Sequence, residues 1–323
     1  MKYMAICIKG LEDIAIKEIK EILKVDAKKI IDGRLAFEAK EVKKLIERSQ
    51  SLVKVYENWG KLKFKELDEI GNFVNKKNLE MKKKFKISCH RDGEHVFTSQ
   101  MVEQEVGKVI DGEHDLKEPE EVVFADVVDN TFIFGLDLSP RLLSKREYRI
   151  KVCNQSINAC IAYSMIRLSG YKGGIFLDPF AKDGVIVIEA VKYKKGKVNG
   201  FDDLFHNIRS CEINSKMAGV NKEINLSRTD IEWLDTKFKE GEVEQVVTTI
   251  PFPSKHVVEK KVKKVYDQFL YQLKYVLGKK SKCVVIGQNM DLFKEMLSEF
   301  KIVDERDVKT GGLTQEIVVF KLR

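Results

Sequence analysis

The chain has 323 residues, of which 43% are hydrophobic and 33% charged, and its formal net charge is +8. This composition excludes disordered, collagen-like and disulfide-scaffold proteins and allows about two domains. No uncharged apolar run approaches the roughly 18–20 residues that a membrane helix needs, and the first residues lack the pattern of a secretory leader. We therefore expect a cytoplasmic protein that does not bind membranes.

Six cysteines and five histidines are scattered along the chain. No two cysteines form a Cys-x-x-Cys pair, and no histidine has metal-ligand spacing to them, so the sequence predicts no metal site. The cysteines fit small buried apolar residues. Nothing in the sequence suggests a Ser/His/Asp or Cys/His triad.

The positive charge is unevenly distributed. Residues 1–150 contain 29 basic and 28 acidic side chains, whereas residues 151–323 contain 29 and 22. Within the first part, lysines gather in residues 76–86, close to Arg91, and acidic residues gather in residues 101–150. A basic face that binds a polyanion is one interpretation, and lysines that only keep the chain soluble are the other.

Residues 1–150 predict an α+β region in which strands and short amphipathic helices follow one another. The predicted strands are 3–8, 35–38, 52–59, 85–89, 121–128 and 131–137, and the predicted helices are 14–23, 42–48 and 98–110. Asp129-Asn130 is a turn pair, so the last two strands should form a hairpin.

After residue 150 the pattern changes, and we place a domain boundary there. The predicted strands are 174–177, 197–201, 244–249 and 283–287, and the predicted helices are 156–169, 185–192, 208–218, 257–277 and 291–299. This alternation predicts an α/β fold with a mostly parallel, doubly wound sheet. The strands 304–309 and 316–322, around Gly311-Gly312, should add an antiparallel hairpin at one edge.

Ligands of a doubly wound sheet bind beyond the carboxyl ends of its strands, so the loops there carry the candidate site. The first loop begins Asp178-Pro179-Phe180 and runs through Gly184 into a helix. Backbone N–H groups at such a helix start can bind a nucleoside cofactor. Gly184 is the one glycine in this loop that would allow a close approach.

Two carboxylates follow the next strands. Asp202 has the position from which a carboxylate can accept hydrogen bonds from a ribose diol, although it could also be a loop residue that caps a helix. Asp230 could contact an adenine amine or could be a turn carboxylate. In a third loop, Phe252 could stack on a planar substrate or fill the core.

Several motifs in both parts of the chain are typical of one protein family. They are Lys9–Ala15, Ser88–Gln100, Glu105–Gly107, Asp115–Pro119, Gly135–Ser139 and Leu143–Arg149 in the first part, and Asp178–Phe180, Gly184, Ile188–Ala190, Asn214, Ala218–Val220 and Gly311–Leu313 in the second. Together they resemble the THUMP-domain RNA methyltransferases, most closely the archaeal-type enzymes that methylate the exocyclic N2 amine of guanosine in tRNA. The likeness covers nearly the whole chain.

This resemblance implies a ferredoxin-like and THUMP RNA-binding region in residues 1–150 and a Rossmann-like methyltransferase domain in residues 151–323. It implies S-adenosylmethionine as the cofactor and tRNA, not DNA, as the partner; some relatives also bind a small activator protein. The implied cofactor-binding residues are Asp178, Phe180, Gly184, Asp202 and Asp230. The residues implied to surround the target base are Thr249, Ile250, Pro251 and Phe252.

The chain departs from the family pattern at the chemical centre. Ala181, Lys182, Asp183 and Val185 stand where the family has Cys, Gly, Ser and Thr, and Thr249-Ile250-Pro251-Phe252 stands where it has Asn-Pro-Pro-Tyr. Thr249 offers only a hydroxyl to the target amine, while the Ile250 carbonyl and the Phe252 ring are kept. Two main interpretations follow: an active methyltransferase, or a catalytically silent relative that holds tRNA or a partner protein. Altered chemistry that uses Lys182 and Asp183 in a remodelled pocket is a third, for which the sequence offers no independent support.

Contacts with tRNA phosphates are expected from basic residues in both parts of the chain. The candidates are Lys82, Lys84, Arg91, Lys145 and Arg146. Arg91 and Lys145 could instead be structural ion-pair partners.

Overall fold

The computed structural model describes residues 1–139, 141–253, 258–310 and 312–323, so the predicted helix start at Val257 and the predicted turn residue Gly311 lie outside the described residues. By its contacts the chain divides into two units. One contains Met1–Ile6 and Ile16–Leu143, and the other contains Cys7–Ala15 and Ser144–Arg323. No helix among the described residues combines the length and the apolar character needed to cross a bilayer.

The first unit begins with a sheet of order β2-β3-β1-β4, the strand order of a ferredoxin-like fold. All pairs with β3 are antiparallel, and Asp32-Gly33 turns the chain between β2 and β3. The elements are β1 (Lys2–Cys7), α1 (Glu12–Leu23), β2 (Ala27–Ile31), β3 (Arg34–Glu38), α2 (Lys43–Arg48) and β4 (Leu52–Glu57).

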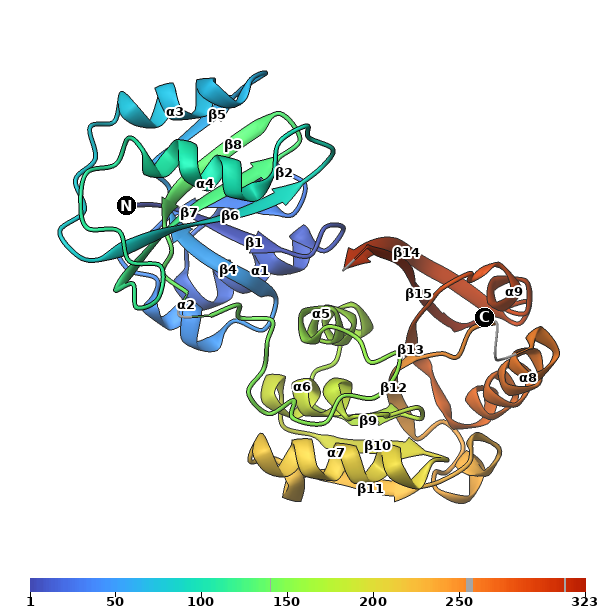
Figure 1. The fold of residues 1–323 in the computed structure, drawn as a ribbon. Helices are drawn as coiled ribbons and strands as arrows, with labels where there is room; N and C mark the ends of the chain where they lie inside the picture. The colour runs from blue at the N-terminus through green and yellow to red at the C-terminus, as the bar shows by residue number, and fades with distance from the viewer. Residues whose placement is uncertain (140, 254–257, 311) are drawn as a thin grey trace. The chain divides into compact units, whose positions relative to one another are not determined.

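A second sheet, of order β5-β8-β7-β6, lies where the THUMP module is predicted. Helices α3 and α4 lie along one face of this sheet and share a core with it (Figure 1). The Thr98 hydroxyl accepts a hydrogen bond from Met101 N (3.3 Å) and caps α4. The elements are β5 (Gly60–Lys63), α3 (Leu67–Asn75), β6 (Phe85–Asp92), α4 (Ser99–Gly107), β7 (Glu121–Val128) and β8 (Thr131–Leu136).

A buried ion pair joins the two sheets of the first unit. Arg34 on β3 donates to both oxygens of Asp126 on β7, at 2.6 and 2.8 Å, and Tyr56 OH donates to the same carboxylate at 3.1 Å. Although burial acts to raise it, the pKa of Asp126 is lowered by Arg34 and His90 beside it. Because its partners are in place, this carboxylate is buried in the charged form.

The second unit is built on a seven-stranded sheet of order β11-β10-β9-β12-β13-β15-β14. The first five strands are parallel, and β15 is antiparallel to both β13 and β14. The predicted edge hairpin consists of β14 and β15. The elements are α5 (Ala159–Ser169), β9 (Ile175–Asp178), α6 (Val185–Tyr193), β10 (Lys197–Asp202), α7 (Phe205–Met217), β11 (Ile224–Arg228), β12 (Val243–Thr249), α8 (Glu259–Val276), β13 (Leu277–Gly287), α9 (Asp291–Glu295), β14 (Phe300–Thr310) and β15 (Leu313–Leu322).

The strand order reverses between β9 and β12. From β9 the chain proceeds outward through β10 to β11, whereas from β12 it proceeds the other way to β13, with helices on both faces of the sheet (Figure 1). Helices α8 and α9 cover one face through a core that contains Leu177, Tyr266 and Phe293. This doubly wound sheet confirms the predicted fold class and opens a crevice beyond the carboxyl ends of β9 and β12.

Candidate active site

A cavity of about 300 Å³ lies at the carboxyl ends of β9, β10 and β12. It contains five of the residues selected from the sequence: Phe180, Asp202, Asp230, Thr249 and Pro251. The other lining residues are Gln155, Pro179, Lys182, Asp203, Leu204, Asn207, Thr229, Ile231, Val265 and Gln268. The topology thus brings together side chains from loops that are far apart in the sequence.

Asp178 ends β9 and is almost completely buried. Its Oδ1 accepts hydrogen bonds from the Thr248 hydroxyl (2.6 Å) and from Phe180 N (3.2 Å), while its Oδ2 has no partner among the described residues. Burial raises the pKa of Asp178 to about 7. A buried carboxylate oxygen without a partner can accept a hydrogen bond from a polar ligand.

The loop after Asp178 uses its own N–H groups internally. Ala181 N donates to Phe201 O (2.8 Å), Lys182 N donates to Asp202 Oδ2 (3.0 Å) and Gly184 N donates to Ala181 O (2.7 Å). These bonds fix the loop against the end of β10. They also leave those N–H groups unable to cradle a ligand, so recognition depends on side chains.

Gly184 is required for packing. Its φ is +82°, and a Cβ at this position would overlap Cys211 Sγ of α7. Gly184 therefore allows α6 to begin close to α7. It does not line the cavity, and its predicted contact with a cofactor stays a prediction.

The two predicted carboxylates beyond Asp178 do line the cavity. Asp202 Oδ1 accepts from Leu204 N (3.0 Å) and Asn207 Nδ2 (2.9 Å), so both of its oxygens already have partners. Asp230 Oδ1 accepts from Glu232 N (3.1 Å), which makes Asp230 the cap of the short 3-10 helix Ile231–Thr236. Asp202 therefore fixes its own loop without capping α7, whose start at Leu204 has no side-chain cap, whereas Asp230 is a turn carboxylate; both side chains line the cavity.

The third loop divides its predicted residues between the cavity and the core. Thr249 lines the cavity, and its buried Oγ1 has no partner among the described residues. Ile250 is buried in the core beneath, with its N–H bonded to Ile286 O (3.0 Å). Phe252 is half-buried and is not among the residues that line this cavity.

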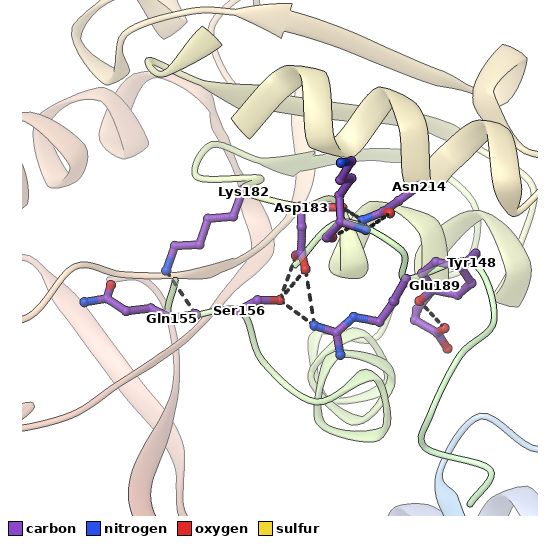
Figure 2. A network of polar contacts seen from close by, with 9 residues as sticks. Tyr148, Gln155, Ser156, Lys182, Asp183, Glu189 and Asn214 are labelled. Atoms are coloured by element: carbon purple, nitrogen blue, oxygen red, sulfur yellow. Dashed lines mark hydrogen bonds and ion pairs between the residues drawn. The ribbon is translucent and has the colours of Figure 1, made fainter. Parts of the chain in front are cut away.

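Lys182 was missed as a site residue, although the sequence marked it as a departure. Its backbone has a left-handed φ of +50°, a conformation that suits glycine. Its side chain lines the cavity, and its ammonium donates to Gln155 O at 3.3 Å (Figure 2). Burial lowers the pKa of Lys182, although Asp178 and Asp202 counteract this effect.

Comparison with known families identifies the second unit. The family described as RMKL-like methyltransferase domain matches residues 146–316, which is more than half of the chain. The chain belongs to this family. The methyltransferase resemblance inferred from the motifs is thereby confirmed.

Individual proteins are similar to this chain in sequence or in fold. The chain is 26% identical to the tRNA (guanine(6)-N2)-methyltransferase of Methanocaldococcus jannaschii, over 74% of this chain and 76% of that protein. The fold is similar to that of TrmN from Thermus thermophilus, with a TM-score of 0.81, 22% identity and coverage of 100% and 99% of the two chains. A protein solved in complex with SAH gives a TM-score of 0.81, with 14% identity and coverage of 100% and 98%.

Buried polar contacts fix the segment that leads into the methyltransferase domain, and Figure 2 shows the one between Tyr148 and Glu189. Arg146 donates to both carboxylate oxygens of Glu189 on α6, at 3.0 and 3.2 Å, and Tyr148 OH donates to Glu189 Oε1 at 2.6 Å. Because the Arg146 guanidinium is largely buried in this pair, Arg146 has a structural role here, and its location differs from that expected for a surface phosphate contact.

Further hydrogen bonds fix the same segment between Arg149 and Ser156, closer to the cavity. The Ser156 hydroxyl donates to Asp183 at 2.7 Å, and Arg149 Nη2 donates to Asp183 Oδ2 at 3.2 Å. Asn214 of α7 accepts a hydrogen bond from Lys151 N through its Oδ1 and donates one to Lys151 O through its Nδ2. Residues 144–150 therefore pack with the second unit, so the division between the units precedes the predicted boundary.

The other predicted RNA contacts are on the surface or near it. Lys82 and Lys145 are exposed. Lys84 is exposed but pairs with Glu113 (3.0 Å) and Asp115 (3.7 Å), which reduces its local positive charge. Arg91 Nε donates to Ser99 Oγ at 3.3 Å, and its guanidinium lies over the Phe97 ring.

The first turns of α8 carry a cluster of lysines that sequence reasoning missed. All four are exposed, and none has an ion pair with another described residue: Lys260, Lys261, Lys263 and Lys264. Val265 and Gln268, on the same helix, line the cavity. A repeated Lys-Lys spacing at the start of the helix was the available signal.

Metal chemistry has no candidate centre in the described part of the chain, where no group of three or more His, Cys, Asp or Glu side chains could hold an ion. All six cysteines are free thiols. Cys7, Cys160, Cys211 and Cys283 are buried, as expected of small apolar residues, whereas Cys89 and Cys153 are partly exposed.

Proposed function

We propose that the methyltransferase domain binds S-adenosylmethionine in the cavity at the carboxyl ends of β9, β10 and β12. The observation that carries this proposal is the set of side chains there. Asp202 would accept hydrogen bonds from the ribose hydroxyls, while Asp230 and Ile231 would contact the adenine. Phe180 supplies an apolar wall. When bound, the cofactor supplies an electrophilic methyl group.

Two buried oxygens at the carboxyl ends of β9 and β12 could accept hydrogen bonds from a polar ligand, although Asp178 is not among the residues that line the cavity. Asp178 Oδ2 and Thr249 Oγ1 are buried and have no partner among the described residues, and unpaired buried oxygens of this kind are rare. Asp178 would accept a hydrogen bond from the amino group of the cofactor, and the carboxylates around the cavity favour its positive charge. A titration with S-adenosylmethionine tests the fit: no heat at millimolar ligand would remove the cofactor from the proposal.

We infer that the methyl acceptor is the N2 amine of a guanosine in tRNA, in line with the activity named for the Methanocaldococcus jannaschii relative. The Thr249 hydroxyl would accept a hydrogen bond from the amine, the Ile250 carbonyl would accept a second one, and the Phe252 ring would stack on the base. The test is incubation of the protein with tRNA and labelled cofactor, followed by nucleoside mass spectrometry. Formation of N2-methylguanosine supports the proposal.

The second candidate function is that of a catalytically silent relative that holds tRNA, and the position of the Lys182 side chain in the cavity favours it. A lysine side chain occupies space beside Asp202, in a loop whose N–H groups are bonded internally. The two candidates differ in one result. If tRNA binds tightly but neither cofactor binding nor methylation occurs, the chain is a tRNA-holding module; the small activator protein stays a prediction in either case.

Replacement of Thr249 by valine tests the role of its hydroxyl. Thr249→Val keeps the shape but removes the acceptor, so we expect the turnover rate to fall roughly tenfold to a hundredfold while cofactor affinity is unchanged. The matched control is Thr229→Val, because Thr229 also lines the cavity but its hydroxyl already bonds Ser227 Oγ (3.0 Å). Equal turnover in the Thr249 variant and the wild type would exclude Thr249 from the chemistry.

Binding of tRNA is expected to depend steeply on salt, because the contacts are with phosphates. We include the four α8 lysines among these contacts, since they are exposed and lie in the first turns of the helix whose Val265 and Gln268 line the cavity. Changing all four to glutamine should weaken tRNA binding roughly tenfold or more and lower the slope of log affinity against log salt by roughly 2–4. Filter binding between about 50 and 300 mM salt measures both effects.

A control with the same change in charge separates this effect from net charge. Lys194 and Lys195 precede β10, and Lys279 and Lys280 are near the start of β13, so all four lie toward the opposite edge of the sheet from the cavity. Changing these lysines to glutamine should leave the slope nearly unchanged. An equal loss in both quadruple variants would mean that α8 makes no specific contact.

A further inference from the structure

The cavity has an uneven charge distribution. Among the described residues that line it, the acidic ones are Asp202, Asp203 and Asp230, and Lys182 is the one basic residue. The proposed cofactor carries a sulfonium, an ammonium and one carboxylate. Carboxylates on the protein favour the two cationic groups, so the cofactor carboxylate needs a different partner.

The Lys182 ammonium has unused hydrogen-bonding capacity. In the part of the chain that the structure describes, it makes one hydrogen bond, to Gln155 O at 3.3 Å, and no carboxylate oxygen lies within ion-pair distance of it. A lysine ammonium has three donors. A partly buried cation with donors to spare is stabilised by any anion that reaches it.

The side chain is also held in place at its base. Lys182 N donates to Asp202 Oδ2 at 3.0 Å, which fixes the backbone from which the side chain leaves. Gln155, whose carbonyl accepts the hydrogen bond from the ammonium, has a left-handed φ of +60°, and Lys182 has a left-handed φ of +50°. Figure 2 shows the Lys182 side chain extended toward Gln155. Non-glycine residues in this region cost energy and are found where the surrounding structure fixes them.

We propose that Lys182 binds the α-carboxylate of the amino-acid portion of the cofactor. This inference rests on the proposed function, because it assigns one more residue of the same cavity. The Lys182 ammonium would donate a charge-assisted hydrogen bond to the cofactor carboxylate. Asp202, which accepts a hydrogen bond from Lys182 N, would accept from the ribose hydroxyls. Lys182 is thus a specificity residue that distinguishes ligands with the carboxylate from ligands without it.

The test compares two ligands that differ in this group alone: S-adenosylhomocysteine and its decarboxylated form, which keeps the amine. Their affinities are measured by calorimetry for the wild type, Lys182→Met and Lys182→Arg. The methionine variant should bind S-adenosylhomocysteine roughly tenfold to a hundredfold more weakly and bind the decarboxylated ligand within roughly twofold of the wild type. The arginine variant keeps the charge and should recover most of the difference.

The outcomes separate this inference from the proposed function. If Lys182→Met weakens both ligands equally, weakens neither or strengthens S-adenosylhomocysteine, Lys182 does not bind the carboxylate, and the proposed function is untouched. If the wild-type protein binds neither ligand at millimolar concentration, the proposed cofactor site fails and the Lys182 assignment fails with it. Thermal melting of each variant shows whether it is folded.

Discussion

Glu189→Ala should destabilise the methyltransferase domain by about 3–5 kcal/mol. Glu189 is completely buried on α6 and accepts hydrogen bonds from Arg146 and Tyr148. Removing it takes the buried carboxylate away from the Arg146 guanidinium and the acceptor away from the Tyr148 hydroxyl. Breaking a buried pair by removing one partner costs far more than the loss of an exposed pair.

The matched control is Glu212→Ala. Glu212 also pairs with two basic residues, Arg209 at 2.5 Å and Lys216 at 3.0 Å, but on the exposed face of α7. Its loss should cost no more than about 1 kcal/mol. Urea unfolding can be followed in a Trp59→Phe background, in which Trp233 of the second unit is the remaining tryptophan. Equal midpoints for the two alanine variants would contradict the prediction.

The contacts of Glu189 with Arg146 and Tyr148 should also affect ligand binding. The segment that begins at Arg146 continues to Gln155, which lines the cavity, and to Ser156, whose hydroxyl donates to Asp183. Loss of these contacts should therefore weaken cofactor binding as well as stability. A double variant, Glu189→Leu with Arg146→Met, replaces the ion pair by apolar groups and should recover much of the stability.

Periodicity predicted the parts of the fold that have strong local signals. The strands β9, β10 and β12 are short and contain apolar residues, and helices α6 to α8 follow at crossover spacing, so the doubly wound sheet and its carboxyl-edge loops could be placed from the sequence. Elements with weak signals were missed. β5 is a four-residue edge strand, Gly-Lys-Leu-Lys, and β2 contains two lysines.

Helix α3 was missed for a different reason. Its start has a usable signal, since Glu66 N donates to the Glu69 side chain at 3.4 Å in a capping arrangement. The helix is short and contains Gly71, which packs against Glu105 of α4. A glycine inside a helix lowers the propensity on which a sequence prediction depends, and here tertiary packing outweighs it.

The site could be predicted as a set of loops but not as a set of contacts. Asp202 and Thr249 follow predicted strands of one parallel sheet, so their convergence could be foreseen, whereas β11, the strand before Asp230, was not predicted. The pairing of Arg146 with Glu189 joins residues 43 positions apart, and no local pattern reveals it. The orientation of Lys182 depends in the same way on Gln155, which lies in a different loop.

The second large effect is expected from Asp178. Burial raises the pKa of this carboxyl from 3.8 to about 7, so the folded protein holds the proton more tightly than the unfolded chain does. Stability should therefore rise as the pH falls from about 7 toward 4, and the destabilising contribution of the ionised group should be fully present above about pH 7. Its size is on the order of 4 kcal/mol at most.

Asp178→Asn removes this titration and keeps an oxygen that can accept from Thr248. The difference in unfolding free energy between variant and wild type should be small near pH 4, should grow in favour of the variant up to about pH 7, and should then stay constant. Measuring both proteins at each pH cancels the contributions of shared groups that do not interact with Asp178. A difference that is independent of pH would show that Asp178 is ionised in the folded state throughout this range.

The same carboxyl should make cofactor binding depend on pH in the opposite sense. An ionised Asp178 is the better acceptor for the cationic amine of S-adenosylhomocysteine, so binding should tighten as the pH rises through about 7, roughly tenfold between pH 6 and 8. The asparagine variant should bind more weakly and with little dependence on pH. If the wild type shows flat affinity while the stability difference titrates as expected, Asp178 is protonated by burial but does not contact the cofactor. The two measurements on one variant thus separate the electrostatics of the fold from the recognition of the ligand.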